Sequence, residues 1–250
     1  MRECHTVEIL GLGFFKGKAQ DVVHLVKSGG LLMVPAAPAL VNITKDISYY
    51  HSLQFADIII PDSAFMTIIW NMVYKEKISK ISGLKLLRAF LSDEEVIDTA
   101  NLLLVDPCQV DARYNIEYLR SNNFTLSDDI SYVAPLYNKG MVEDNVLLDL
   151  IEQRKPRFII INLGGGIQEK LGAYLKRRLS YKPAIICTGA AIAFLTGRQV
   201  KIPNWGDKYC LGWLFRCIEK PGLYVPRYIK GFKLLSLLLN HGKKAPFVKE

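Results

Sequence analysis

The residue with the clearest potential for chemistry is Asp62, which follows the β-branched run Ile58–Ile60. Three consecutive isoleucines predict a strand buried on both faces, and Pro61 ends its ladder of hydrogen bonds. In open α/β sheets, ligands bind beyond the carboxyl ends of the strands, so Asp62 stands where a catalytic carboxylate would act. Alternatively, Asp62 only caps the helix expected over 64–74, and this stretch alone favours the cap.

A second candidate is the run Gly164-Gly165-Gly166, which directly follows the apolar segment 157–163. That segment is the clearest buried strand in the sequence. Glycines between a strand and a helix let backbone N–H groups approach an anion or a base without obstruction by a Cβ. The alternative is a flexible turn that binds nothing. A lone glycine triplet does not distinguish a ligand-binding loop from such a turn.

The elements that must position these residues alternate between strands and helices. We expect strands over 31–34, 58–60, 101–105, 131–133, 157–163 and 183–187, and helices over 18–28, 39–43, 64–74, 83–91, 111–119, 146–151 and 190–195. Residues 6–15 with the following helix form a further β-α unit, and the helix over 64–74, apolar almost all round, is expected to be buried. This alternation predicts an α/β fold, a Rossmann-like parallel sheet flanked by helices.

The composition changes after Gly197, where aromatic residues and leucines alternate with Lys and Arg. We therefore expect one α/β domain over 1–197 and a basic helical appendage over 198–250. Such a segment suits the boundary of a membrane, with apolar side chains entering the headgroup region and cations meeting anionic lipid. A C-terminal helical pair that covers a sheet edge, with solvated cations, explains the pattern equally well.

Composition limits the class of protein. Of the 250 residues, 32 are Lys or Arg and 24 are Asp or Glu, a net charge of +8 that suits a nucleotide, a nucleic acid or an acidic lipid surface. The five cysteines form no C-x-x-C pair and the four histidines are scattered, so neither a disulfide framework nor a metal site is expected. No apolar run reaches the roughly 20 residues of a membrane span, and no signal-peptide pattern begins the chain. These features predict that the protein is located in the reducing cytoplasm.

Four features occur in a recognisable order along the chain: Asp62 after Ile-Ile-Ile-Pro, the strand-Gly-x-x-Gln-Glu element, the segment 189–197, and Trp213-Leu214-Phe215-Arg216 followed by Pro221. In this order the chain resembles the WecG/TagA/CpsF family of bacterial glycosyltransferases, from about residue 31 to residue 232.

The resemblance implies an inverting hexosyl or N-acetylhexosaminyl transferase that needs no metal or other cofactor. Its donor would be a UDP-sugar and its acceptor a polyprenyl-diphosphate-linked saccharide, in the synthesis of a surface polysaccharide or a teichoic-acid-type linkage. The enzyme would work as a peripheral protein on the inner face of the cell membrane. The donor sugar, the acceptor saccharide, the linkage and any homo-oligomer stay open.

The resemblance also places site residues. The family's catalytic base falls on Asp62, its Gln-Glu pair on Gln168 and Glu169, its Trp-x-x-Arg on Arg216, and a later arginine on Arg227. In an inverting transfer a carboxylate removes the proton of the acceptor hydroxyl while that oxygen attacks the anomeric carbon. The arginines, with backbone amides at 164–166, would stabilise the departing UDP. Lipid or solvent contact is the other interpretation of the arginines.

Several polar residues of the family pattern are replaced, at Pro35, Ala37, Lys85, Ala193 and Gly212. These replacements remove side chains that could donate or accept hydrogen bonds, so they bear on donor choice and activity. An alternative is therefore a non-catalytic, membrane-associated binding subunit of a polysaccharide assembly complex. Retention of Asp62, Gln168 and Arg216 favours a working enzyme.

Two other classes are disfavoured. A nucleotide-dependent oxidoreductase would need a complete glycine fingerprint, but after Gly11 and Gly13 the third position is Lys16. Nucleic-acid binding is disfavoured because the basic residues gather with leucines near the C-terminus and no nucleic-acid motif is present.

Overall fold

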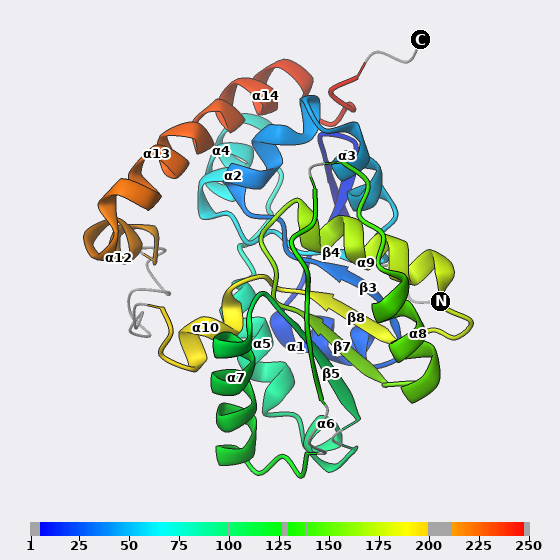
Figure 1. The fold of residues 1–250 in the computed structure, drawn as a ribbon. Helices are drawn as coiled ribbons and strands as arrows, with labels where there is room; N and C mark the ends of the chain where they lie inside the picture. Colours follow the sequence, from blue (N-terminus) through cyan, green and yellow to red (C-terminus); the bar gives the residue numbers. More distant parts are fainter. Residues whose placement is uncertain (1–5, 100, 127–129, 139, 200–211, 248–250) are drawn as a thin grey trace.

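The computed structural model describes residues 6–99, 101–126, 130–138, 140–199 and 212–247 (Figure 1). The described strands form one sheet in the order β1-β2-β4-β3-β8-β7-β5-β6, in which every neighbouring pair is parallel except that β1 runs antiparallel to β2. The strands are β1 (Thr6–Ile9), β2 (Leu12–Phe15), β3 (Gly30–Met33), β4 (Ile58–Ile59), β5 (Leu102–Asp106), β6 (Ser131–Val133), β7 (Phe158–Ile161) and β8 (Ala184–Cys187). The predicted α/β fold with a largely parallel sheet is confirmed.

Helices cover both faces of this sheet (Figure 1). The described helices, of which η1 is a 3-10 helix, are α1 (Ala19–Val26), α2 (Ala37–Leu40), η1 (Val41–Thr44), α3 (Ile47–Gln54), α4 (Ala64–Tyr74), α5 (Gly83–Leu91), α6 (Glu94–Thr99), α7 (Gln109–Ser121), α8 (Asn145–Arg154), α9 (Ile167–Arg178), α10 (Ala191–Leu195), α12 (Gly212–Glu219), α13 (Pro221–Gly231) and α14 (Lys233–His241). Alternate side chains of β7 enter opposite cores, with Ile159 and Ile161 on the side of α3, α8 and α9, and Phe158 and Ile160 on the side of α1, α5 and α7. A strand buried on both faces is apolar at every position, which is why β7 could be predicted from the sequence.

The first strand departs from the prediction. Residues 6–15 form an antiparallel hairpin rather than one strand of a β-α unit. The two turn residues, Leu10 and Gly11, both have positive φ values of 55° and 72°, as the tight turns favoured in hairpins require. Leucine rarely adopts this conformation, and here the two turn N–H groups donate to the carbonyls of Gly242 and Lys243, 2.8 and 2.9 Å away. A contact across the whole chain therefore stabilises a turn that local sequence does not indicate.

The helix α4 also differs from expectation. Met66 and Trp70 are fully buried, but Ile68 is 55% exposed and Met72 is 71% exposed. The prediction of a helix buried all round was therefore wrong. One side of α4 packs against α14, and the other side presents apolar side chains at the surface.

The helices α12 to α14 lie along one side of the molecule, where α13 packs against α2 and α14 against α4 (Figure 1). Leu234 and Leu238 of α14 are fully buried in the core on that side of the sheet, and the Tyr74 hydroxyl donates to the Leu238 carbonyl at 2.8 Å. The domain boundary at 197/198 stays a prediction, and the first part of the predicted appendage, residues 200–211, lies outside the described residues. Large apolar side chains of these helices are exposed: Trp213, Leu214, Ile218, Leu223, Val225, Ile229, Phe232 and Leu239.

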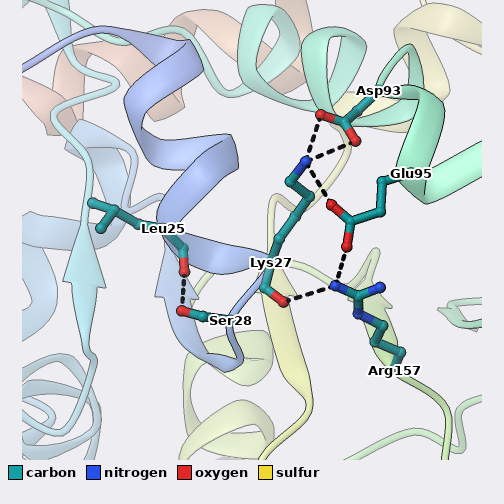
Figure 2. A network of polar contacts seen from close by, with 6 residues as sticks. All are labelled: Leu25, Lys27, Ser28, Asp93, Glu95 and Arg157. Carbon is teal, nitrogen blue, oxygen red and sulfur yellow. Dashed lines mark hydrogen bonds and ion pairs between the residues drawn. The ribbon is translucent and has the colours of Figure 1, made fainter.

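A network of ion pairs joins three elements at the amino-terminal edge of the sheet (Figure 2). Lys27, just after α1, lies 2.9 Å from carboxylate oxygens of both Asp93 and Glu95. Arg157, which precedes β7, pairs with Glu95 and donates to the Lys27 carbonyl at 3.4 Å. These partly exposed pairs orient α6 against the sheet more than they stabilise the fold. They lie at the opposite edge of the sheet from Asp62, which follows β4.

Candidate active site

A cavity of about 880 Å³ lies at the carboxyl edge of the sheet. Its walls come from the segments that follow β3, β4, β5, β7 and β8, and from α12 and α13. From β5 the chain continues outward to β6, whereas from β7 it crosses in the opposite direction to β8. The neighbouring ends of β5 and β7 therefore form a topological switch point, where open α/β sheets bind ligands.

Asp62 lines this cavity and is partly exposed. Its Oδ1 accepts a hydrogen bond from the backbone N–H of Gly83 at 2.9 Å, which holds the carboxylate in one orientation. Its Oδ2 has no hydrogen-bond or ion-pair partner among the residues that the structure describes. Ser63, and not Asp62, caps α4, because the Ser63 hydroxyl accepts from Met66 N at 3.1 Å. The interpretation of Asp62 as a helix cap is therefore wrong.

The glycine run after β7 lies partly in the same cavity. Gly164 and Gly165 line it, whereas Gly166 does not and instead precedes α9 with a φ of +94°. That φ value favours glycine over any residue with a side chain. The structure thus brings Gly164 and Gly165 to the site of Asp62, and gives Gly166 a role in turning the chain into the helix.

Gln168 and Glu169 are almost completely buried behind this turn, although both contribute to the cavity wall. The Gln168 Oε1 accepts from Gly189 N at 2.7 Å, and its amide nitrogen donates to Glu169 at 3.2 Å. The Glu169 Oε2 accepts from Gly166 N at 2.6 Å. These bonds tie the loops after β7 and β8 together, so the pair is well placed to shape the glycine turn.

Burial raises the pKa of the Glu169 carboxyl above its ordinary value, and hydrogen bonds from Gly166 and Gln168 oppose this effect only in part. A raised pKa means that the folded protein binds the proton more tightly than the unfolded chain, so Glu169 stabilises the fold at low pH and loses this contribution as pH rises. We expect the stability of wild type relative to Glu169→Gln to fall as pH increases above about 4.5, the ordinary pKa of glutamate. Denaturant unfolding of both proteins between pH 4 and 8 would measure it. A constant difference across this range would contradict the prediction.

The two predicted arginines lie on the helical side of the cavity. The guanidinium of Arg216 lies over the ring of Phe194, 4.5 Å from its centroid, and donates to the Tyr228 hydroxyl at 3.4 Å. Its Nε is buried and has no hydrogen-bond partner within the described part of the chain. Arg227 is exposed at the rim. Both residues therefore share one cavity with Asp62.

The replaced family positions divide into two groups. Ala37, Ala193 and Gly212 line the cavity, whereas Pro35 and Lys85 do not. Three sites on the cavity wall thus carry no side-chain hydrogen-bonding group, which makes this wall less polar than the family pattern implies.

Sequence reasoning missed other polar groups of the cavity. Asn162 and Thr188 directly follow β7 and β8, where the carboxyl-edge rule that singled out Asp62 would also have found them. The pair formed by Arg198 and Asp111, with Nε and Oδ1 3.0 Å apart, also lines the wall. No sequence signal joins these two residues, which are 87 positions apart.

The described residues contain neither a metal-binding cluster nor a membrane-spanning helix. No cluster of three or more His, Cys, Asp or Glu side chains has the geometry to hold a metal ion. No helix there combines the length and the apolar character needed to cross a membrane.

Comparison with known proteins connects this site to a family. The model of the glycosyl transferase WecG/TagA/CpsF family matches residues 7–246, nearly the whole chain. A search of curated proteins found none that matches it.

Proposed function

Because the chain belongs to the WecG/TagA/CpsF family of glycosyltransferases, which act in cell-envelope polysaccharide synthesis, we propose that it is an inverting transferase. Its donor is a UDP-sugar and its acceptor a polyprenyl-diphosphate-linked saccharide. The observation that carries the proposal is that Asp62, Gly164, Gly165, Arg216 and Arg227 line one cavity at the carboxyl edge of the sheet.

The geometry of Asp62 suits a general base. Its Oδ1 is held by Gly83 N, and its Oδ2 is left to accept the proton of an acceptor hydroxyl. In a single displacement the acceptor oxygen forms a bond to the anomeric carbon as the bond from that carbon to the UDP oxygen breaks. The proton moves to Asp62, and UDP leaves with the electron pair of the broken bond.

The departing diphosphate needs positive charge and hydrogen-bond donors. Arg216 brings a guanidinium charge to the cavity wall, Arg227 adds charge at the rim, and Gly164 and Gly165 allow close approach of the backbone. In this proposal these groups take the role that a metal ion has in many other transferases, and no cofactor is required.

A direct test incubates the purified full chain with a panel of UDP-hexoses and UDP-N-acetylhexosamines and with short polyprenyl-diphosphate saccharides, followed by mass spectrometry of the lipid product. A product of inverted anomeric configuration, formed in the presence of EDTA, supports the proposal. The nonpolar side chains at Ala37 and Ala193 in the cavity suit a second candidate, a non-catalytic binding subunit. Binding of UDP and acceptor lipid without transfer from any donor would favour that candidate.

We further propose that α12 to α14 rest on the membrane and bring the lipid-linked acceptor to the cavity. Leu223, Ile229 and Phe232 are more than half exposed, with Lys230 and Lys233 on the same helices. Exposed apolar side chains beside cations are what an anionic bilayer surface binds.

A vesicle experiment tests this orientation. Each basic residue near an anionic surface contributes about 1 kcal/mol to binding. Reversing the charge of two of them, in the double variant Lys230→Glu with Lys233→Glu, is therefore expected to weaken vesicle binding by at least about tenfold. Sedimentation with phosphatidylglycerol vesicles would measure it. The matched control is Lys182→Glu, an exposed lysine before β8 at the other edge of the sheet, which should bind like wild type. Equal binding by all three proteins would exclude this surface.

A further inference from the structure

Arg216 lies on a helix that does not by itself fix the position of its side chains. α12 stands at one end of the row formed by α12 to α14 (Figure 1), and none of its residues is buried. An arginine side chain has several rotatable bonds, so ordering it costs conformational entropy. A donor that stabilises the charge of a transition state must nevertheless be held in place before the reaction. Arg216 therefore needs contacts from outside α12.

Aromatic residues of α10 and α13 supply these contacts. The Arg216 Cζ lies over the ring of Phe194 in α10, 4.5 Å from its centroid, and its Nη1 donates to the Tyr228 hydroxyl in α13 at 3.4 Å. The two aromatic side chains are themselves held in place. Phe194 is only 9% exposed, and the Tyr228 ring lies edge-on to Trp213 and parallel to Tyr224, with centroids 6.1 and 6.4 Å apart. All of these residues line the cavity.

These contacts orient Arg216 without cancelling its charge. No carboxylate pairs with Arg216 in the part of the chain that the structure describes, whereas Arg198 on the same cavity wall is paired with Asp111. Burial raises the pKa of the Tyr228 hydroxyl above its ordinary value of 10.0, and the charge of Arg216 opposes this only in part, so the phenol stays neutral near pH 7. An aromatic ring attracts a cation through its quadrupole and carries no net charge. The positive charge of Arg216 is therefore left for an anionic ligand.

We propose that Phe194 and Tyr228 are positioning residues for Arg216. The ring of Phe194 limits the movement of the guanidinium on one side, and the Tyr228 hydroxyl limits its rotation. Together they hold the guanidinium at the cavity wall before the leaving diphosphate develops its charge. This inference rests on the proposed function, because it assumes that negative charge grows near Arg216 during transfer of the sugar.

Double-mutant cycles on kcat test the inference. Tyr228→Phe keeps the ring and removes only the hydroxyl, whereas Phe194→Leu keeps the apolar bulk and removes the ring. Each should lower kcat by about threefold to tenfold, the range of one hydrogen bond or one cation–π contact, and leave the KM for the donor within about twofold of wild type. In the Arg216→Ala background neither should lower kcat further, because the group that they position is absent.

The matched control is Tyr114→Phe. The Tyr114 ring lies under the guanidinium of Arg198, 5.1 Å from its Cζ, and does not line the cavity. Because Arg198 is already held by Asp111, removing the Tyr114 hydroxyl should leave kcat at the wild-type value in both backgrounds. Thermal unfolding of each variant shows whether it is folded, and Tyr228→Phe alone decides the test if Phe194→Leu does not fold.

A purely structural role predicts a different result. If Tyr228→Phe and Phe194→Leu lowered kcat by the same factor with and without Arg216, the two residues would support the fold and the inference would be overturned, with the proposed function intact. Wild-type kcat in both single variants would have the same consequence. Absence of transfer by wild type with every donor would overturn the proposed function and the inference with it.

Discussion

Replacing Asp62 by Asn is expected to lower the kcat of glycosyl transfer by about 10²-fold to 10⁴-fold, the range that general-base catalysis contributes. Asparagine has nearly the same shape and can still accept from Gly83 N through its Oδ1, so the loop keeps its position. What the variant lacks is a group that accepts the proton of the acceptor hydroxyl. Steady-state kinetics with the best donor and acceptor pair from the panel would measure the loss, and UDP affinity should stay close to that of wild type.

The neighbouring residue provides the control. Ser63→Ala removes the cap of α4 and should cost about 1 kcal/mol of stability while leaving kcat within a few-fold of wild type. If the two variants behaved in the opposite way, with Asp62→Asn less stable but fully active, Asp62 would be a structural residue and the proposed base would have to be found elsewhere.

The fold could be predicted where the sequence pattern reports burial directly. β3, β5, β7 and β8 are short apolar runs because both faces of each strand are covered, and helices such as α4 and α5 lie close to their predicted bounds. The hairpin of β1 and β2 could not be predicted, because its turn places Leu10 at positive φ and bonds it to Gly242 near the other end of the chain. The helix α3 was missed because its pattern of apolar residues is weak: it contains Tyr49, Tyr50, His51 and Ser52.

The site was predictable to the extent that its residues follow strands. Asp62 and the Gly164 run were found because each ends an apolar run at the carboxyl edge. The hydrogen bond from Gly83 to Asp62 and the position of Arg216 over Phe194 join segments that are distant in sequence, and they depend on packing that no local pattern encodes. Sequence reasoning also favoured a cap at Asp62 because Asp and Ser are both good caps, and only the position of the hydroxyl relative to Met66 N decides between them.

The second large effect is expected at Arg216. Removing a preorganised donor from the place where negative charge develops typically lowers kcat by about 10²-fold to 10³-fold, so Arg216→Ala should lose activity in this range. Arg216→Lys retains a positive charge but not the Nε or the planar fork of donors, and should recover only part of the loss. The effect should fall on kcat more than on KM, because the charge on the UDP oxygen grows as the bond to the sugar breaks.

Arg198 is the matched control for charge, since it lines the same cavity but is already paired with Asp111. Arg198→Ala should reduce kcat by less than about tenfold, because a cation committed to a carboxylate at an exposed site offers little to the leaving group. Thermal unfolding separates loss of chemistry from loss of the contact between Arg216 and Phe194, which contributes about 1 kcal/mol or less. Full activity in Arg216→Ala, with reduced activity in Arg198→Ala, would move the leaving-group role from α12 to the loop that follows α10.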